Sequence, residues 1–394
     1  MGTPRMSTEK TASLKVWLRS TAAVGLSIVA LGAAVAGAAA SDAGVQRGAS
    51  TGAPPGRSIA YALYERKEAV YEAMDKDKKN TFTECPSGLY EFGPREQFAA
   101  LFPQTDGKKW TLVESSLARE AEIWFPDPHA PDKFEFKEVT GKISEGLNLD
   151  GKVKPSDFVS PHGTPGIDNQ FYRAVGCIPS YRLGSSQLLF YEEYLEIKQF
   201  NRTIIEISEV DSLENDDDVT VTTYRGLDPL VKDALGGHQA GTTQRVDMVW
   251  GQDFIQKSKA KITNGVLTTT EPATFVWPNE NHTDAAIEFM HEARFELRLS
   301  PDKMEGLIGG YLDVESGYRA MIKRYGSHQI SYGRLAAASL YRVLRRLADG
   351  YPDPATGENT AISTALEVKG VQVDLIFPEK KTAGVEKSTI RSGN

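Results

Sequence analysis

The feature that most constrains the fold is a long region in which apolar and polar residues alternate. Between Leu188 and about Ile322, short alternating runs such as TIIEIS, DVTVTT, AKITNGVLTTT and EARFELRLS follow one another, with turn residues between them. The dipeptide Asn264-Gly265 predicts a tight hairpin, because a type I′ turn needs two residues that tolerate positive φ. Strands connected by short turns form antiparallel sheets. The sequence therefore predicts a mainly β fold, with an antiparallel β-sandwich or barrel-like core and a few flanking α-helices.

Two segments show helical spacing instead. Residues 334–349 place their leucines on one face and their arginines on the other, and Gly350 follows in the position of a C-terminal cap. From Arg57 to about Asp75, apolar residues recur at helical intervals between Glu and Lys residues. This spacing predicts a second helix at the start of the folded region.

The first forty residues have the organisation of a secretory signal peptide. Lys15 and Arg19 precede an apolar run that begins at Thr21 and ends in the small residues Ala38-Ala39-Ala40. A basic start, an apolar centre and a small-x-small end are typical of such peptides. The alternative is a single N-terminal membrane anchor, for which the run is barely long enough. We expect export to the periplasm or the extracellular space, with no stable membrane span after cleavage of the signal.

Changes in composition divide the chain further. The small, polar and Gly/Pro-rich stretch after the signal predicts a disordered leader, and the charged C-terminal stretch predicts a disordered tail. Between them lie a mixed region with a Gly/Pro/Asp-rich loop and a β-rich region with the late helix. The predicted divisions are a signal peptide over 1–40, the leader over 41–56, the mixed α/β region over 57–187, the β-rich region over 188–378 and the tail over 379–394.

The chain contains two cysteines, Cys85 and Cys177. Thiols exported to an oxidising compartment tend to pair, and both of these residues follow the signal peptide. The alternative is a pair of buried free thiols. The sequence favours a Cys85–Cys177 disulfide, which would constrain much of the mixed region.

Charge and motif content exclude several classes of function. The formal net charge is −8 and no basic stripe interrupts the acidic surface, so nucleic acid is not an expected partner. There is no CxxCH motif and therefore no covalently attached haem, and there is no Walker loop for a nucleotide. There is no G-x-S-x-G nucleophile elbow either, and the catalytic residues of any enzyme stay unassigned.

An oxygen-rich segment, LDGKVKPSDFVSPHGTPGIDNQ, is the strongest candidate for a ligand site. It places four oxygen-bearing side chains among Gly and Pro residues, namely Asp150, Asp157, Asp168 and Asn169. Calcium is bound by carboxylate, amide and backbone oxygens supplied by such turning loops. The alternative is an ordered loop without metal, because Asp, Asn, Gly and Pro are also ordinary turn residues. The sequence predicts either a calcium site or an ordered hinge that leads into Cys177.

Other carboxylates suggest a different chemistry. Glu192 and Glu196 share one face if LLFYEEYLEI is a strand, and paired carboxylates beside aromatic residues are what a glycosidase uses. The alternative is an ordinary strand with solvated carboxylates. The acidic run from Glu214 to Asp218 predicts a solvated hairpin tip.

Two stretches, GTPGIDNQFYRAVGC and LYRVLRRLADGYPDPATGENTAIS, resemble a group of exported bacterial proteins of unassigned activity. Some members of that group occur beside periplasmic c-type cytochromes or other electron-transfer proteins. The resemblance extends over residues 150–377 and implies export and a shared fold. It assigns no catalytic residue, but it implies a redox or envelope protein as a partner.

These observations predict an exported, non-catalytic binding or scaffold protein that is held by a disulfide and stabilised by calcium. One alternative is a hydrolase that acts on a polysaccharide. A second alternative is an accessory protein to a periplasmic oxidoreductase.

Overall fold

The computed structural model describes most of the chain that follows the predicted leader. The described residues are 57–73, 82–89, 104–109, 117–119, 122–124, 127–129, 136–182, 202–249, 252–280, 285–325 and 337–378. They form a mostly β structure with few helices, as the alternating pattern predicts. The predicted signal peptide, leader and tail lie outside the described residues.

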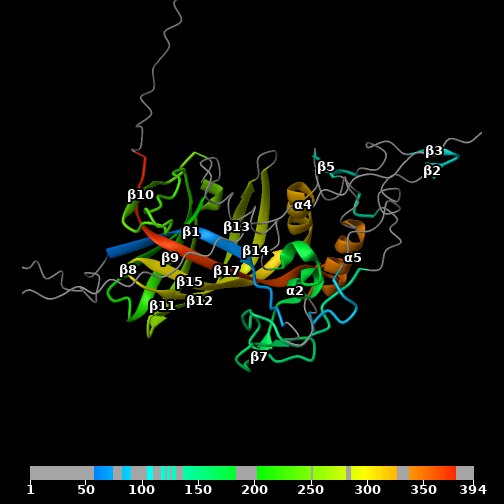
Figure 1. Ribbon diagram of the computed structural model, residues 1–394, viewed down its shortest axis with the longest axis horizontal. Helices are drawn as coiled ribbons and strands as arrows, with labels where there is room; N and C mark the ends of the chain where they lie inside the picture. Colours follow the sequence, from blue (N-terminus) through cyan, green and yellow to red (C-terminus); the bar gives the residue numbers. More distant parts are fainter. Residues whose placement is uncertain are drawn as a thin grey trace, which may run out of the picture. The chain divides into compact units, whose positions relative to one another are not determined.

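Within the described residues, eight antiparallel strands form a closed barrel. Each strand pairs with the next one in the barrel, and the last pairs with the first, so the topology is up-and-down. Figure 1 shows the first strand, in blue, beside the last, in red, although they come from opposite ends of the described chain. The barrel strands are β1 (Arg57–Glu68), β8 (Arg202–Val210), β9 (Asn215–Gly226), β11 (Gln256–Thr263), β12 (Val266–Glu271), β14 (Ala285–Leu299), β15 (Lys303–Asp313) and β17 (Asn359–Ile376).

Shorter elements extend this barrel. Three strands pair with barrel strands, namely β10 (Thr242–Arg245) and β16 (Gly350–Pro352) with β17, and β13 (Ala273–Glu280) with β14. The small hairpins are β2 (Gln104–Thr105) with β3 (Lys108–Lys109), β4 (Leu117–Arg119) with β5 (Glu122–Trp124), and β6 (Phe158–Val159) with β7 (Pro165–Ile167). The helices are α2 (Gln170–Val175), α4 (Val314–Tyr325) and α5 (Ala337–Leu347), with short 3-10 turns η1 (Pro179–Tyr181) and η2 (Gln252–Phe254). None of the helices in these described ranges has the length and apolar character that a membrane crossing requires.

The hairpin predicted at Asn264-Gly265 is confirmed. The two residues connect β11 to β12 with φ angles of 51° and 75°, and Thr263 pairs with Val266 across the turn. Positive φ at both central positions is what a type I′ turn requires. Glycine accepts this conformation without steric cost, and asparagine tolerates it better than most residues.

The prediction of a helix from Arg57 to about Asp75 is wrong, because the segment begins with β1. Tyr61 and Leu63 face the barrel interior, while Ala60 and Ala62 pack outside it against the segment that carries β10. A strand that is buried on both faces loses its alternation of apolar and polar residues. Its apolar residues therefore recur in a pattern that is easily taken for helical spacing.

The predicted late helix is confirmed by α5, but it ends at Leu347, and Gly350, predicted as its cap, begins β16 instead. The sequence did not predict α4. The alternating pattern predicts strand structure to about Ile322, whereas β15 ends at Asp313. The Oδ1 atom of Asp313 accepts a hydrogen bond from the backbone N–H of Ser316 at 2.7 Å. This contact caps the first turn of α4 and ends the strand at that residue.

The Cys85–Cys177 disulfide is confirmed. The bond joins the 82–89 segment to the residue that closely follows α2, and the two Cα atoms are 5.9 Å apart. Arg182 lies beside it, with Nη2 donating to Cys85 Sγ at 3.1 Å and Nη1 paired with the buried Glu84. The bond therefore ties the 136–182 segment to a second, distant part of the chain.

Candidate functional site

The outer face of β14, β15 and β17 carries a concentration of charged side chains. Successive residues of a strand point to opposite sides, so Leu297, Ile308 and Leu366 enter the barrel core while their neighbours point outward. The strand register places the outward residues in two rows across the sheet. These rows are Arg298, Glu305 and Lys369, and Glu296, Leu307 and Glu367.

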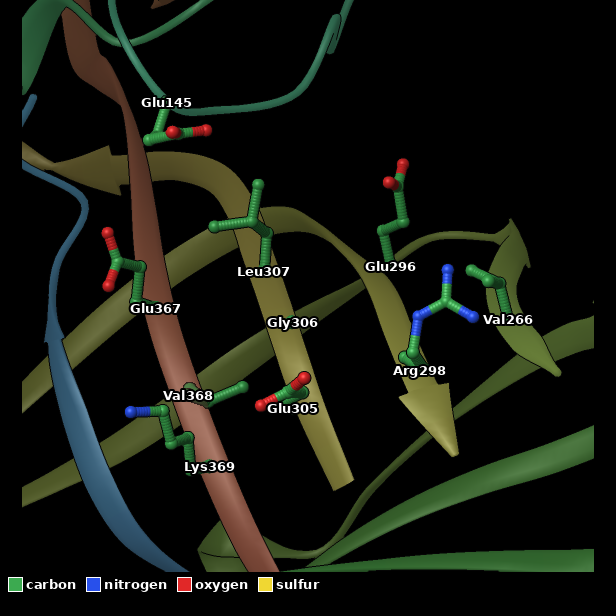
Figure 2. A pocket seen from close by; sticks show the side chains of 10 residues that line it. All are labelled: Glu145, Val266, Glu296, Arg298, Glu305, Gly306, Leu307, Glu367, Val368 and Lys369. Carbon is green, nitrogen blue, oxygen red and sulfur yellow. The ribbon is translucent and has the colours of Figure 1, made fainter. Parts of the chain in front are cut away.

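These rows line a groove of about 460 Å³ on the barrel surface. Its walls are Glu145, Val266, Glu296, Arg298, Glu305, Gly306, Leu307, Glu367, Val368 and Lys369. Figure 2 shows that Glu145 comes from a separate segment that passes beside the strands, while the other charged side chains rise from the sheet. The groove therefore has a floor of strands and one wall made by a loop.

The charges in the groove differ in whether they are already paired. Lys369 Nζ lies 3.0 Å from Glu65 Oε2, and Lys67 Nζ lies 3.2 Å from Glu367 Oε2. Among the described residues, the side chains of Glu296, Arg298 and Glu305 make no hydrogen bond or ion pair. These three charges are the ones that a ligand could engage without breaking an existing contact.

Glu145 is half-buried where it faces the groove. Burial raises the pKa of its carboxyl group, and the nearby negative charge of Glu367 raises it further, whereas His162 opposes this effect. A positive charge placed between Glu145 and Glu367 would offset the repulsion between the two carboxylates and so lower the pKa of Glu145. The loop wall therefore favours a cation.

The segment that carries Glu145 lies directly on β15. A Cβ atom on Gly309 would be 3.1 Å from Leu147 Cδ1 and 3.3 Å from Leu149 Cδ2. The absence of a side chain at this position allows the loop to approach the strand closely. Gly309 thus allows the loop to pack closely against β15 beside the groove.

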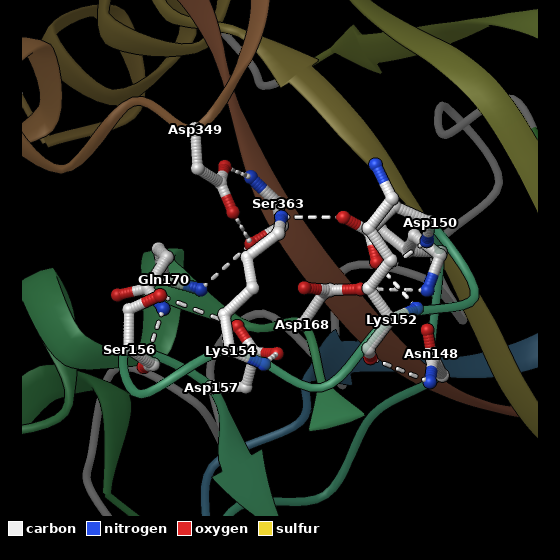
Figure 3. A network of polar contacts seen from close by, with 11 residues as sticks. Asn148, Asp150, Lys152, Lys154, Ser156, Asp157, Asp168, Gln170, Asp349 and Ser363 are labelled. Carbon is white, nitrogen blue, oxygen red and sulfur yellow. Dashed lines mark hydrogen bonds and ion pairs between the residues drawn. The ribbon is translucent and has the colours of Figure 1, made fainter.

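Three of the predicted calcium ligands, Asp150, Asp157 and Asp168, lie in the same loop (Figure 3). Asp168 Oδ2 accepts hydrogen bonds from the backbone N–H groups of Leu149 at 2.7 Å and Asp150 at 3.4 Å. Asp150 pairs with the ammonium group of Lys154, and Asp157 Oδ2 accepts from the Lys154 backbone N–H at 2.6 Å. The three aspartates therefore hold the turns of the loop, and Lys154 supplies a positive charge beside them.

Asn169 has a different role from the three aspartates. Its Oδ1 caps α2 by accepting from the backbone N–H of Tyr172 at 3.2 Å. Its Nδ2 donates to Ser144 Oγ at 3.1 Å and to the carbonyl oxygens of Ala69 at 3.1 Å and Glu145 at 2.9 Å. The side chain is buried and connects α2 to the residue that forms the groove wall.

Two residues that the sequence did not predict, Asp349 and Ser363, connect this loop to the barrel. Asp349 accepts hydrogen bonds from both the backbone N–H and the hydroxyl of Ser363, each at 2.7 Å, and Ser363 Oγ accepts from the Gln170 backbone N–H at 3.0 Å. Burial raises the pKa of Asp349, while the Ser363 contacts lower it. Asp349 stands in the acidic stretch DGYPDP, but the sequence gives no sign that it meets Ser363.

The described residues were also compared with the ligand groups that bind metal ions. Among the side chains of the described ranges, no three His, Cys, Asp or Glu residues form a group that could hold a metal ion. The acidic hairpin tip instead caps itself, because Asp216 accepts from the backbone N–H groups of Asp211 at 2.6 Å and Asp218 at 3.2 Å. Glu192 and Glu196 lie outside the described residues, so the hydrolase hypothesis stays a prediction.

Comparisons with models of protein families, with curated proteins and with solved structures gave no match.

Proposed function

We propose that this protein is an exported, non-catalytic binding protein of the bacterial envelope, and that the groove on β14, β15 and β17 receives a basic segment of a partner protein. The observation that carries the proposal is the set of unengaged charges in the groove. Glu296 and Glu305 offer carboxylates from the floor, and Glu145 adds a third from the loop wall. Lys or Arg side chains would pair with these groups.

Arg298 indicates that the partner segment also carries a negative charge. It is the positive charge of the groove that has no contact among the described residues, since Lys369 is already paired with Glu65. A guanidinium group binds a carboxylate in a fixed, two-pronged geometry. The groove therefore suits an extended peptide that carries several basic residues and one acidic residue. An envelope or electron-transfer protein with such a loop fits the resemblance to exported proteins.

Replacing two groove carboxylates is expected to weaken binding of a basic peptide. The Glu296→Gln/Glu305→Gln variant should bind a fluorescently labelled, lysine-rich peptide about 5- to 10-fold more weakly, because each exposed ion pair contributes up to about 1 kcal/mol. Fluorescence anisotropy at low and high salt measures the effect, and salt should reduce the difference. The matched control is Asp216→Asn/Asp218→Asn, which removes the same charge at the β8–β9 hairpin. Equal affinity of wild type and the groove variant would refute the proposal.

Calcium remains part of the proposal, with oxygens from Asp150, Asp157, Asp168 and Asn169; among the described residues these side chains do not form a metal group, so calcium would have to draw them together. The support is that the three aspartates lie in one loop and that a carboxylate oxygen which accepts one hydrogen bond keeps a further lone pair. The ammonium group of Lys154 pairs with Asp150, so calcium would compete with it.

We expect the Lys154→Gln variant to respond to calcium more strongly than wild type. Removing the competing ammonium leaves Asp150 free to ligate, and a ligand at about a hundred times its Kd stabilises a protein by about 2.7 kcal/mol. Thermal melts with calcium and with EGTA measure the response. Lys152→Gln is the control, because the substitution keeps the backbone N–H that hydrogen-bonds to Asp150 and removes an ammonium group that acts on Asp150 only through its charge. If calcium leaves the melting temperature of Lys154→Gln unchanged, the calcium site is wrong.

A further inference from the structure

The groove on β14, β15 and β17 has a candidate occupant in the chain itself, namely the tail of residues 379–394. The tail has a net charge of +2, from four basic and two acidic residues, whereas the whole chain has a formal net charge of −8. The charged residues of the tail are Lys380, Lys381, Lys387, Arg391, Glu379 and Glu386. The leader over 41–56 is neutral, with Asp42 and Arg47 as its charged residues. The tail is therefore the terminal segment whose charge complements the groove carboxylates.

The tail begins close enough to the groove to reach it. β17 contributes Lys369 to the groove and ends at Ile376, and the tail follows Pro378. The chain from Lys369 to Pro378 spans about 30 Å if it is extended, at about 3.3 Å per residue. A segment that folds back over the same distance needs about nine residues, and residues 379–394 provide more than that. The stretch that would arrive over the groove is therefore 386–391.

The charges of this stretch match those that the groove leaves unengaged. Lys387 and Arg391 offer two cations, and the floor of the groove offers two carboxylates that make no contact among the described residues. Glu386 offers one carboxylate, and Arg298 is the groove cation without such a contact. A guanidinium group and a carboxylate form a two-pronged pair. The stretch therefore has the basic residues and the single acidic residue that the groove suits.

We propose that the stretch 386–391 lies in the groove of its own chain and competes there with the partner segment. This inference rests on the proposed function, because it takes the groove to be a site for basic segments. A tether of this kind raises the local concentration of the tail to the millimolar range, so a contact with a Kd of about 1 mM occupies about half of the grooves or more. The tail thus selects for partners that bind tightly enough to displace it.

Tryptic cleavage of the full chain after Lys387 tests this docking without any added peptide. Intact-mass spectrometry follows the loss of residues 388–394. We expect cleavage of Glu296→Gln/Glu305→Gln to be about 2- to 5-fold faster than that of wild type, because the tail is then released to the protease. The double variant of the β8–β9 hairpin described above is the matched control and should be cleaved at the wild-type rate. Equal rates for wild type and the groove variant would overturn the proposal, and so would protection that increases with protein concentration, which assigns the contact to a second copy.

Removing charge from the tail should in turn free the groove. Lys387→Gln/Arg391→Gln should bind the labelled lysine-rich peptide about 2- to 5-fold more tightly than wild type. The control is Ser388→Ala/Thr389→Ala, which changes the same stretch without its charge and should bind as wild type does. If wild type binds the peptide and the tail variant binds it no more tightly, the docking is wrong and the proposed function stands. If no form binds the peptide but the tryptic difference is present, the groove holds the tail and the proposed partner is wrong.

Discussion

Removing the Cys85–Cys177 bond is expected to lower the free energy of unfolding by about 4–5 kcal/mol. The two residues are separated by 92 positions in the sequence, and the entropy of closing a loop of that length gives this value when native-state strain is ignored. The bond holds the 82–89 segment against the region around α2, which includes the loop that forms the groove wall. Its loss should therefore loosen the candidate site as well as lower the overall stability.

Guanidinium unfolding of wild type and of Cys85→Ala/Cys177→Ala measures this loss. Both sulfur atoms are buried, so a dithiol added without denaturant should reduce the native protein slowly. The same dithiol should have no effect on the double variant, which serves as the control for reductant. A difference in unfolding free energy below about 1 kcal/mol would contradict the expected role of the bond.

The Asp168→Asn variant is expected to become more stable than wild type as the pH rises. Burial raises the pKa of Asp168 to about 6; the Leu149 backbone N–H opposes this shift, and the charge of Asp150 adds to it. The folded state therefore binds this proton more tightly than the unfolded state, whose Asp pKa is about 3.9. The stability contributed by Asp168 is complete below about pH 4 and is lost as the pH rises through about 6.

The expected size of this effect is about 3 kcal/mol, because each unit of pKa difference corresponds to about 1.4 kcal/mol. Asparagine keeps an oxygen that can accept from Leu149 but carries no ionisable proton. The unfolding free energy of the variant minus that of wild type should therefore increase between pH 4 and pH 7.5 by about that amount. Chemical unfolding at a series of pH values measures it.

Asp150→Asn provides a control with the opposite sign. The ion pair with Lys154 lowers the pKa of Asp150, so its ionised form stabilises the protein above the ordinary Asp pKa and this contribution is lost as the pH falls. The Asp150 variant should therefore be less stable than wild type at neutral pH and approach it in acid. Parallel pH profiles for the two variants would show that neither environment is as described.

The barrel strands could be predicted because their residues obey a local rule. In β8, β9 and β11 one face meets the apolar cluster and the other carries more polar residues, so the alternation is visible in the sequence. The Asn264-Gly265 turn was predictable for a similar reason, since its backbone conformation depends on those two residues. The β1 strand was not, because its two buried faces depend on β17 and on the segment around β10, which lie far along the chain.

The candidate site was even harder to predict from the sequence, because its parts come from distant segments. Asp150, Asp157 and Asp168 were found because they stand close together in the sequence. Their connection to the barrel was not found, because Asp349 and Ser363 come from the other end of the folded region. The groove residues gave no signal at all, since outward Glu, Arg and Lys residues on strands are ordinary.

The sequence by itself determined the fold class, the pairing of the two cysteines and the position of the oxygen-rich loop, because each of these depends on composition or on neighbouring residues. Only the tertiary structure decided that the strands close into a barrel and that the loop lies across β15 beside a charged groove. Each of these features requires strands to be brought into register across long separations. That register comes from packing of the whole barrel and cannot be read from any single segment.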